Sequence, residues 1–317
     1  MSKLISDISI APDWLWVAFS FGVIILLVVD LSLFGRGSHK ITRRKALLES
    51  GIWITVALIF NGWFAWTYGS ELGLEFLTGY LVEKSLSVDN LFVILLIFSS
   101  FHIPDEYQHR VLFYGVLGAI VLRAFFILVG AQLLHMFEWI LYVFGAILII
   151  TAIKFLRETD EKIDVHENIA IKILRKFIPT TKNFDKNHFF TVENGVRKAT
   201  PLFLALIVIE VTDLIFAVDS IPAVFAVTQD AFVAYASNIL AILGLRALYF
   251  VLADWTSKLR YLKPGLAAIL AFIGTKMLII EIFKIPSWVS LLVVFSILVT
   301  AALSSWYVAR IELKKLH

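Results

Sequence analysis

Two strongly apolar segments of the sequence carry acidic residues at their centres. The acids are Glu83 and Asp89 within GYLVEKSLSVDNLFV, and Glu210, Asp213 and Asp219 within LIVIEVTDLIFAVDS. Carboxylate oxygens are the ligands that hard divalent cations such as Mg²⁺, Ca²⁺ and Mn²⁺ prefer, and they also bind protons. These five residues are therefore the candidate metal ligands of the protein. The next question is which elements place them together.

The composition indicates a membrane protein. Of 317 residues, 60% are apolar and 17% are charged, and the mean hydropathy is +0.87. Globular domains are about 45–50% apolar and about 25% charged. Several apolar runs are long enough to cross a hydrocarbon core of about 30 Å as a helix. We therefore predict an all-α, polytopic helical membrane protein.

We predict nine membrane spans and a cytoplasmic loop. The spans lie near residues 14–34, 46–68, 76–100, 110–133, 137–156, 201–227, 232–253, 263–282 and 287–309. Nearly all lysines and arginines outside the spans then fall on one side, and Lys3 and Lys284 on the other. By the positive-inside rule, the N-terminus is outside and the C-terminus is cytoplasmic.

The loop at 157–200 is expected to hold a small helix at 168–177 and then a short hairpin. Its basic residues are interleaved with acids. We therefore expect them to set topology and contact anionic membrane lipids, with no nucleic-acid binding.

The two acidic segments belong to an internal repeat. EKSLSVDN (83–90) aligns with DLIFAVDS (213–220), and the tripeptide LRA recurs downstream of each. We predict two three-helix repeats of opposite orientation, the architecture in which many secondary transporters place a substrate site at the membrane midplane. The predicted parts are two N-terminal helices in 1–75, a first repeat in 76–156, the loop 157–200, a second repeat in 201–282, and a last helix with a cytoplasmic tail in 283–317.

Buried carboxylates need a balancing positive charge. Each one costs roughly 2.5–3.5 kcal/mol at the centre of a membrane helix. Arg123 and Arg246 lie deep in their spans and Lys84 adjoins Glu83, so these three are candidates for charge balance or gating. One interpretation is that they simply neutralise the acids. The other is that the surplus of acids binds a mobile divalent cation or protons.

Local geometry adds further candidates and one expected distortion. Oxygen donors near the acids are Ser87, Asn90, Ser220 and, more weakly, Asn238. Pro222 cannot donate a hydrogen bond to the carbonyl of Val218, which predicts a helix break beside Asp219. Lys84 is expected to point away from Glu83 and to extend toward the interface. Asp30 is expected to form an interfacial pair with Arg36.

The ligand types narrow the ion. The sequence has no cysteine, and its seven histidines lie at span ends, in loops or at the terminus. An all-oxygen site argues against Cu⁺ and against a histidine- or thiolate-based Zn²⁺ site. An oxyanion would be repelled by the carboxylates. Among oxygen-preferring cations the residues alone do not choose.

The two acidic segments resemble the signature segments of the TerC family of bacterial membrane proteins. The likeness extends to GVLGAIVLRA and SNILAILGLRALYF, covers nearly the whole chain, and is nearest to the Alx branch. The resemblance implies a bacterial inner-membrane protein that exports Mn²⁺, in exchange with H⁺, with the five acids as essential residues. It also suggests contact with the secretion machinery.

Four functions are weighed. The leading one is a secondary transporter that exports Mn²⁺ by alternating access around the acidic site. The alternatives are a gated divalent-cation channel and a non-transporting metallation scaffold for exported proteins. An intramembrane enzyme is the least favoured, because no HExxH, GxSxG or GxGD motif lies in the spans. We expect no enzyme activity and no resident cofactor.

Overall fold

The structure is a computed structural model in which helices form nearly all of the regular structure. It describes residues 8–34, 43–137, 139–157, 178–181, 183–193, 195–252 and 261–315. The helices are α2 (Asp13–Phe34), α3 (Arg43–Tyr68), α4 (Ser70–Ser100), α5 (Asp105–Met136), α6 (Ile140–Arg157), α8 (Pro201–Phe225), α9 (Ala231–Ile242), α10 (Leu245–Leu252), α11 (Leu262–Leu278) and α12 (Ser287–Lys315). The strands are β1 (Phe190–Glu193) and β2 (Val196–Ala199).

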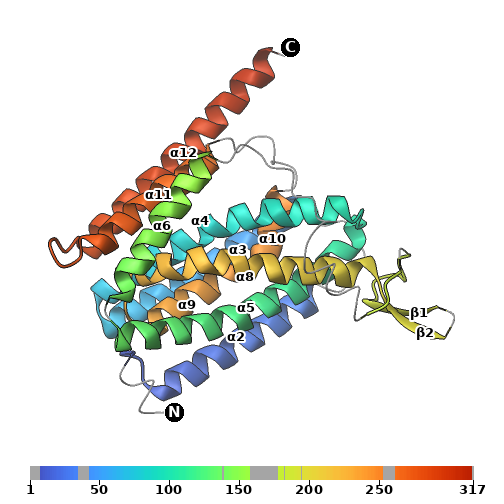
Figure 1. The fold of residues 1–317 in the computed structure, drawn as a ribbon, viewed down its shortest axis with the longest axis horizontal. Coiled ribbons are helices and arrows are strands. Elements are labelled where there is room, and N and C mark those ends of the chain that lie inside the picture. The colour runs from blue at the N-terminus through green and yellow to red at the C-terminus, as the bar shows by residue number, and fades with distance from the viewer. Residues whose placement is uncertain are drawn as a thin grey trace.

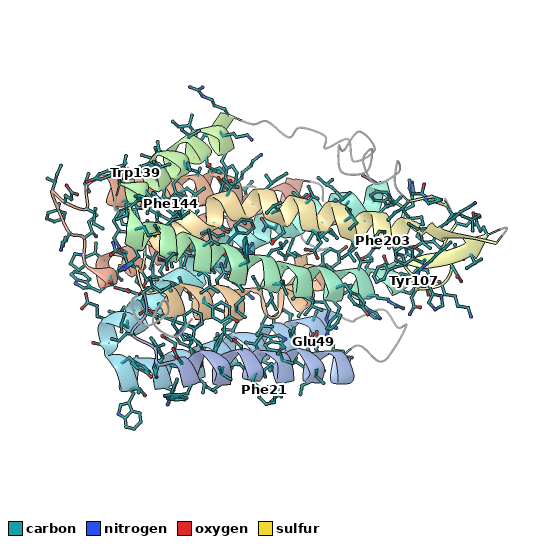
Figure 2. All side chains as sticks on the ribbon, turned by 60° about the horizontal axis from the view of Figure 1, so that its bottom comes forward. Phe21, Glu49, Tyr107, Trp139, Phe144 and Phe203 are labelled. Atoms are coloured by element: carbon teal, nitrogen blue, oxygen red, sulfur yellow. The ribbon has the colours of Figure 1, made fainter. Side chains whose placement is uncertain are left out.

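The prediction of an all-α polytopic membrane protein is confirmed. Six of the described helices are long and apolar enough to span a membrane, and the bent pair α9 and α10 forms a seventh such segment. The two remaining predicted spans coincide with α4 and α11. α4 is long enough but carries several charged residues, including Glu83, Lys84 and Asp89, and α11 has 17 residues, at the short end for a span. Large apolar side chains such as Phe21 and Trp139 are exposed on the outer surface, as lipid contact requires (Figure 2).

The helices of the two predicted repeats pack in matching pairs. α4 packs along α9, α8 packs along α5, and α6 packs along α11 (Figure 1). Exchanging α4 with α8, α5 with α9, and α6 with α11 leaves this set of pairs unchanged. A two-fold relation between three-helix units produces such a pattern. It agrees with the repeat in the sequence, while the domain boundaries remain a prediction.

Aromatic side chains join α2 to the bundle. Trp16 stacks on Tyr235 of α9 with ring centroids 5.3 Å apart, and Ser20 hydrogen-bonds the Tyr235 hydroxyl at 3.2 Å. Nearby, Asp230 caps the N-terminus of α9 and also accepts a hydrogen bond from the backbone N–H of Ile10. The segment before α2 is therefore fixed to the start of α9.

The helix break lies in α9–α10, and the expected break at Pro222 is absent. α8 continues as one helix through Pro222 to Phe225. By contrast α9 and α10 meet at a bend of 43°, where Gly244 has φ +83°. A side chain at Gly244 would lie 2.7 Å from Trp53 of α3. Glycine thus allows both the left-handed backbone and the close approach of α3.

The predicted hairpin is present in the loop between α6 and α8. β1 and β2 pair antiparallel from Phe190–Ala199 to Glu193–Val196, and Gly195 in the turn has φ +77°. The hairpin projects from one end of the molecule (Figure 1). The helix predicted at 168–177 lies outside the described residues.

Candidate metal centre

Arg123 is the centre of the buried polar cluster. Arg123 lies on α5, and its side chain is 1% exposed. It forms an ion pair with Glu83 of α4 and a second one with Asp213 of α8, at 3.0 Å from Nη2 to Oδ1. It also donates to the hydroxyl of Ser220 at 3.3 Å. One cation therefore joins the first acid of each repeated motif.

Glu83 is fully buried and fully engaged. Besides Arg123, its carboxylate accepts hydrogen bonds from Ser87 at 3.3 Å and from the Asn238 amide at 2.9 Å. Ser87 follows Glu83 by one helical turn, which places both side chains on the same face. The amide oxygen of Asn238 is buried and has no hydrogen-bond partner. It is an acceptor available to a cation.

Asp219 and Glu210 occupy separate positions on α8. Asp219 accepts a hydrogen bond of 2.7 Å from Thr151 of α6. Lys154, about one turn after Thr151 on the same helix, interacts with the Asp219 carboxylate by charge attraction. Glu210 lies directly over Gly118 of α5, where an added Cβ would overlap its carboxylate. Both side chains are partly exposed.

The structure does not gather all the predicted ligands around one ion position. Among the residues whose side chains are described, no group of three or more His, Cys, Asp or Glu is arranged to hold a metal. Glu83 and Asp213 share Arg123, and Ser87, Ser220 and Asn238 surround them. Asp89 lies on α4, but its side chain is outside the described part of the chain.

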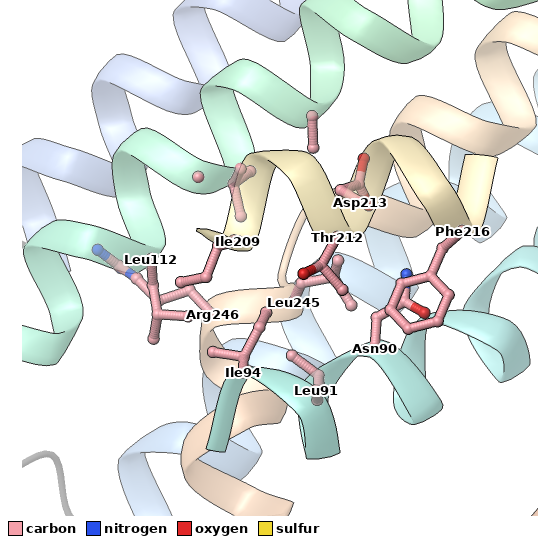
Figure 3. A pocket seen from close by; sticks show the side chains of 13 residues that line it. Asn90, Leu91, Ile94, Leu112, Ile209, Thr212, Asp213, Phe216, Leu245 and Arg246 are labelled. Atoms are coloured by element: carbon pink, nitrogen blue, oxygen red, sulfur yellow. The ribbon is translucent and has the colours of Figure 1, made fainter. Parts of the chain in front are cut away.

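A cavity leads to Asp213. It is a partly open space between α4, α5, α8 and α10, with a cavity volume of about 40 Å³. Asn90, Thr212, Asp213 and Arg246 are its polar lining, among apolar side chains such as Phe216 (Figure 3). The Asp213 side chain is 15% exposed, whereas that of Glu83 is fully buried. A solute in this cavity would meet Asp213 before Glu83.

The structure corrects the predicted surroundings of two charged residues, Lys84 and Asp30. Lys84 does not extend to the interface but donates to the backbone carbonyls of Ala241 and Leu243, at 3.0 and 3.4 Å, where α9 ends. Asp30 pairs with Arg246 at 3.1 Å, and Arg36 lies outside the described residues. In both cases the partner comes from a helix distant in sequence, which local spacing does not reveal.

Two polar residues in this region were not predicted. Thr151 carries a hydroxyl group within the apolar run ILIITAI. That contrast could have marked it as a candidate polar partner of the buried acids. Glu49 on α3 is 1% exposed, and neither of its carboxylate oxygens has a hydrogen-bond partner. It lies near the end of its span, where an acid is ordinarily attributed to the interface, so the sequence gives no clear signal.

The family profile described as "Integral membrane protein TerC family" matches residues 68–312, which include all five candidate acids. The chain belongs to the TerC family. Its relatives include the Alx protein of Escherichia coli strain K12, which is 49% identical over 94% of this chain and 96% of its own. The name of that protein describes a candidate membrane-bound redox modulator.

Other relatives of this TerC family member carry broader names. An uncharacterized membrane protein of Myxococcus xanthus is 48% identical over 94% of this chain and 93% of its own. Another, from Rickettsia bellii, is 40% identical over 92% and 96%. No solved structure matches the chain.

Proposed function

We propose that this TerC family protein is a secondary transporter that exports Mn²⁺ in exchange with protons. The observation that carries the proposal is the bridge that Arg123 forms between Glu83 and Asp213. Two carboxylates from different repeats converge on a single positive charge far from either helix end. A divalent cation can replace that charge, provided that the guanidinium group moves away.

Arg123 then serves as the internal counter-ion of the empty transporter. An unpaired buried carboxylate is strongly unfavourable, so the acids require a cation in every state. With Arg123 in place, its single positive charge lies between the two carboxylates and closes the site to metal, while one negative charge remains in excess. With Arg123 displaced, the Glu83 and Asp213 carboxylates and the free amide oxygen of Asn238 form an oxygen-rich site suited to Mn²⁺.

The cavity beside Asp213 provides an access route. Its polar groups, Asn90 and Thr212, lie next to Asp213, the more exposed end of the cluster. The proposed path runs from this cavity to Asp213 and then to Glu83. Opening to the other side would require the two repeats to rock against each other, as in other transporters built from inverted repeats. Manganese, as opposed to Mg²⁺ or Ca²⁺, rests on the family resemblance.

The proposed setting is the inner membrane of a bacterium, with the N-terminus outside and the C-terminus in the cytoplasm. This orientation rests on the distribution of lysine and arginine. Contact with the secretion machinery, whose exported proteins would be loaded with the metal, rests on the resemblance alone.

A role as a redox modulator is suggested by the name of the Escherichia coli relative. Because this sequence contains no cysteine, thiol–disulfide exchange by the chain itself is excluded. Within the proposal, a redox effect would be indirect, through the concentration of manganese. A gated channel and a metallation scaffold remain the alternatives.

The test is Mn²⁺ flux in proteoliposomes. With a pH difference and no initial metal gradient, the wild-type protein should accumulate Mn²⁺ against its gradient, and Glu83→Gln and Asp213→Asn should abolish this flux. A matched control is Glu71→Gln, an exposed acid in the first turn of α4. Flux that only follows the metal gradient would identify a channel, and absence of flux from an intact, metal-binding protein would favour a scaffold.

A further inference from the structure

A second buried polar cluster lies outside the acidic site. It consists of Asp30 on α2, Glu49 on α3 and Arg246 on α10, and Glu49 lies inside the bundle (Figure 2). Arg246 pairs with Asp30 at 3.1 Å, and Asp30 also accepts a hydrogen bond from the Trp53 side chain. The hydrogen bonds and ion pairs described for Glu83, Arg123 and Asp213 come from α4, α5, α8 and α9. α2 and α3 therefore hold a polar group of their own.

The groups of this cluster are incompletely satisfied. Both carboxylate oxygens of Glu49 and two nitrogens of Arg246, Nε and Nη1, are buried without a hydrogen-bond partner in the described part of the chain. A small cavity of about 10 Å³ is lined by Asp30, Trp53 and Arg246. An ionised carboxylate without a partner is costly in a buried position. Among the described residues no cation hydrogen-bonds Glu49, so an ionised Glu49 needs a positive charge from another source.

The charged groups around Glu49 indicate which positive species could bind there. Asp30 acts on it from α2, Arg246 from α10, and the exposed Lys45 from one turn earlier on α3 itself, while His109 on α5 acts on Arg246. With both acids ionised, the buried part of the cluster has two negative charges and one positive. A divalent cation would find only two carboxylates here, without the additional hydroxyl and amide oxygens that surround Glu83 and Asp213. A proton needs no further ligand.

We propose that Glu49 is a proton-binding site, and that Arg246 couples its occupancy to cation binding at Asp213. Arg246 lines the cavity beside Asp30 as well as the larger cavity that reaches Asp213 (Figure 3). When Glu49 is protonated, the pair of Asp30 and Arg246 is neutral. When Glu49 is ionised, the same cluster has a net negative charge, which favours a cation in the adjoining cavity.

Proton binding at Glu49 and cation binding at Asp213 therefore oppose each other. Such coupling is reciprocal, because a cation that lowers proton affinity has its own affinity lowered by the proton. This second step rests on the proposed function, since it requires that Asp213 binds a cation. The proton site itself does not.

The proton site can be tested without transport. Infrared difference spectra of the full chain in lipid nanodiscs, recorded across pH, should contain the carbonyl band of a protonated carboxylic acid that Glu49→Gln removes. Glu49→Asp, which keeps a carboxyl group, should shift the band, and Glu71→Gln should leave it unchanged. A spectrum that neither Glu49 variant alters, in protein that melts as a folded species, would overturn the proposal.

The coupling is tested by calorimetric titration with MnCl₂ at several pH values. The wild-type affinity should rise with pH, and Glu49→Gln should reduce that rise by about fivefold or more, the usual scale of coupling between sites. An unchanged pH dependence would disprove the coupling. If the wild-type chain binds no Mn²⁺, the proposed function and the coupling both fail, while the infrared band still decides whether Glu49 holds a proton.

Discussion

Glu83 and Asp213 occupy equivalent positions in the two sequence repeats, and both bind the guanidinium group of Arg123. The equivalent of Arg123 in the second repeat is Arg246, which pairs with Asp30 outside the repeats. The two-fold relation is therefore broken at its charged centre. One arginine pairs with both midplane acids, and the other is held at the edge of the cavity that leads to them.

Replacing Arg123 by Gln should make folding stability depend on metal. Removing one partner of a buried ion pair typically costs 3–5 kcal/mol, because the remaining charge is left uncompensated. Mn²⁺ should restore part of this loss by taking the place of the guanidinium group. Thermal unfolding with and without MnCl₂ measures the effect.

The control for Arg123→Gln is Arg110→Gln on the same helix, where the guanidinium stacks 5.2 Å from the centroid of the Phe189 ring. That variant should respond to metal as the wild type does. Equal metal responses in all three proteins would show that Arg123 and the cation do not compete.

Asp219→Asn should abolish Mn²⁺ export while the protein remains inserted and folded. Asparagine keeps the size of the side chain and the hydrogen bond from Thr151, but it removes the charge that can bind a cation or a proton. Thr151→Val should have a smaller effect, since it removes one hydrogen bond, worth about 0.5–1.5 kcal/mol. Efflux assays with matched membrane expression compare the two variants, and normal export by Asp219→Asn would remove Asp219 from the mechanism.

Gly118→Ala should displace Glu210. A methyl group at this position overlaps the Glu210 carboxylate, so the side chain or the helix pair α5 and α8 must shift, at a cost of about 1–3 kcal/mol. The matched control is Gly22→Ala on α2, which meets nothing within 4 Å. Melting temperature and efflux together measure the change. If Gly118→Ala behaves like the control in both, the close packing of Glu210 has no functional weight.

The hairpin should lose order in acid. Hydrogen bonds from Lys198, Thr181 and Asn183 hold the pKa of Glu193 below its usual value of 4.5. Because the folded pKa is lowered, the stabilisation is complete above about pH 5 and is lost as the pH falls through the folded pKa. The protection of the β1 and β2 amides against hydrogen exchange, taken relative to the intrinsic exchange rate at each pH, should therefore fall as the pH drops through the folded pKa of Glu193. Glu193→Gln should show no such acid dependence, and an equal acid response in that variant would assign the effect to another group.

Much of the architecture is determined by sequence alone. Apolar runs of membrane-spanning length predicted every long helix, because a bilayer requires each span to satisfy its own backbone hydrogen bonds. Turn residues around Gly195 predicted the hairpin, and acids within apolar segments identified the candidate ligands. Each of these signals is local, so a single segment is enough to read it.

Tertiary structure decided which polar groups meet. The sequence did not reveal that Lys84 binds the end of α9, that Arg246 pairs with Asp30, or that Asp219 faces Thr151. It also misplaced the helix break, because Pro222 is accommodated within α8 while Gly244 allows the bend against Trp53. These contacts depend on how each helix is rotated and crossed against its neighbours. That rotation follows from packing over the whole bundle, and no short segment contains it.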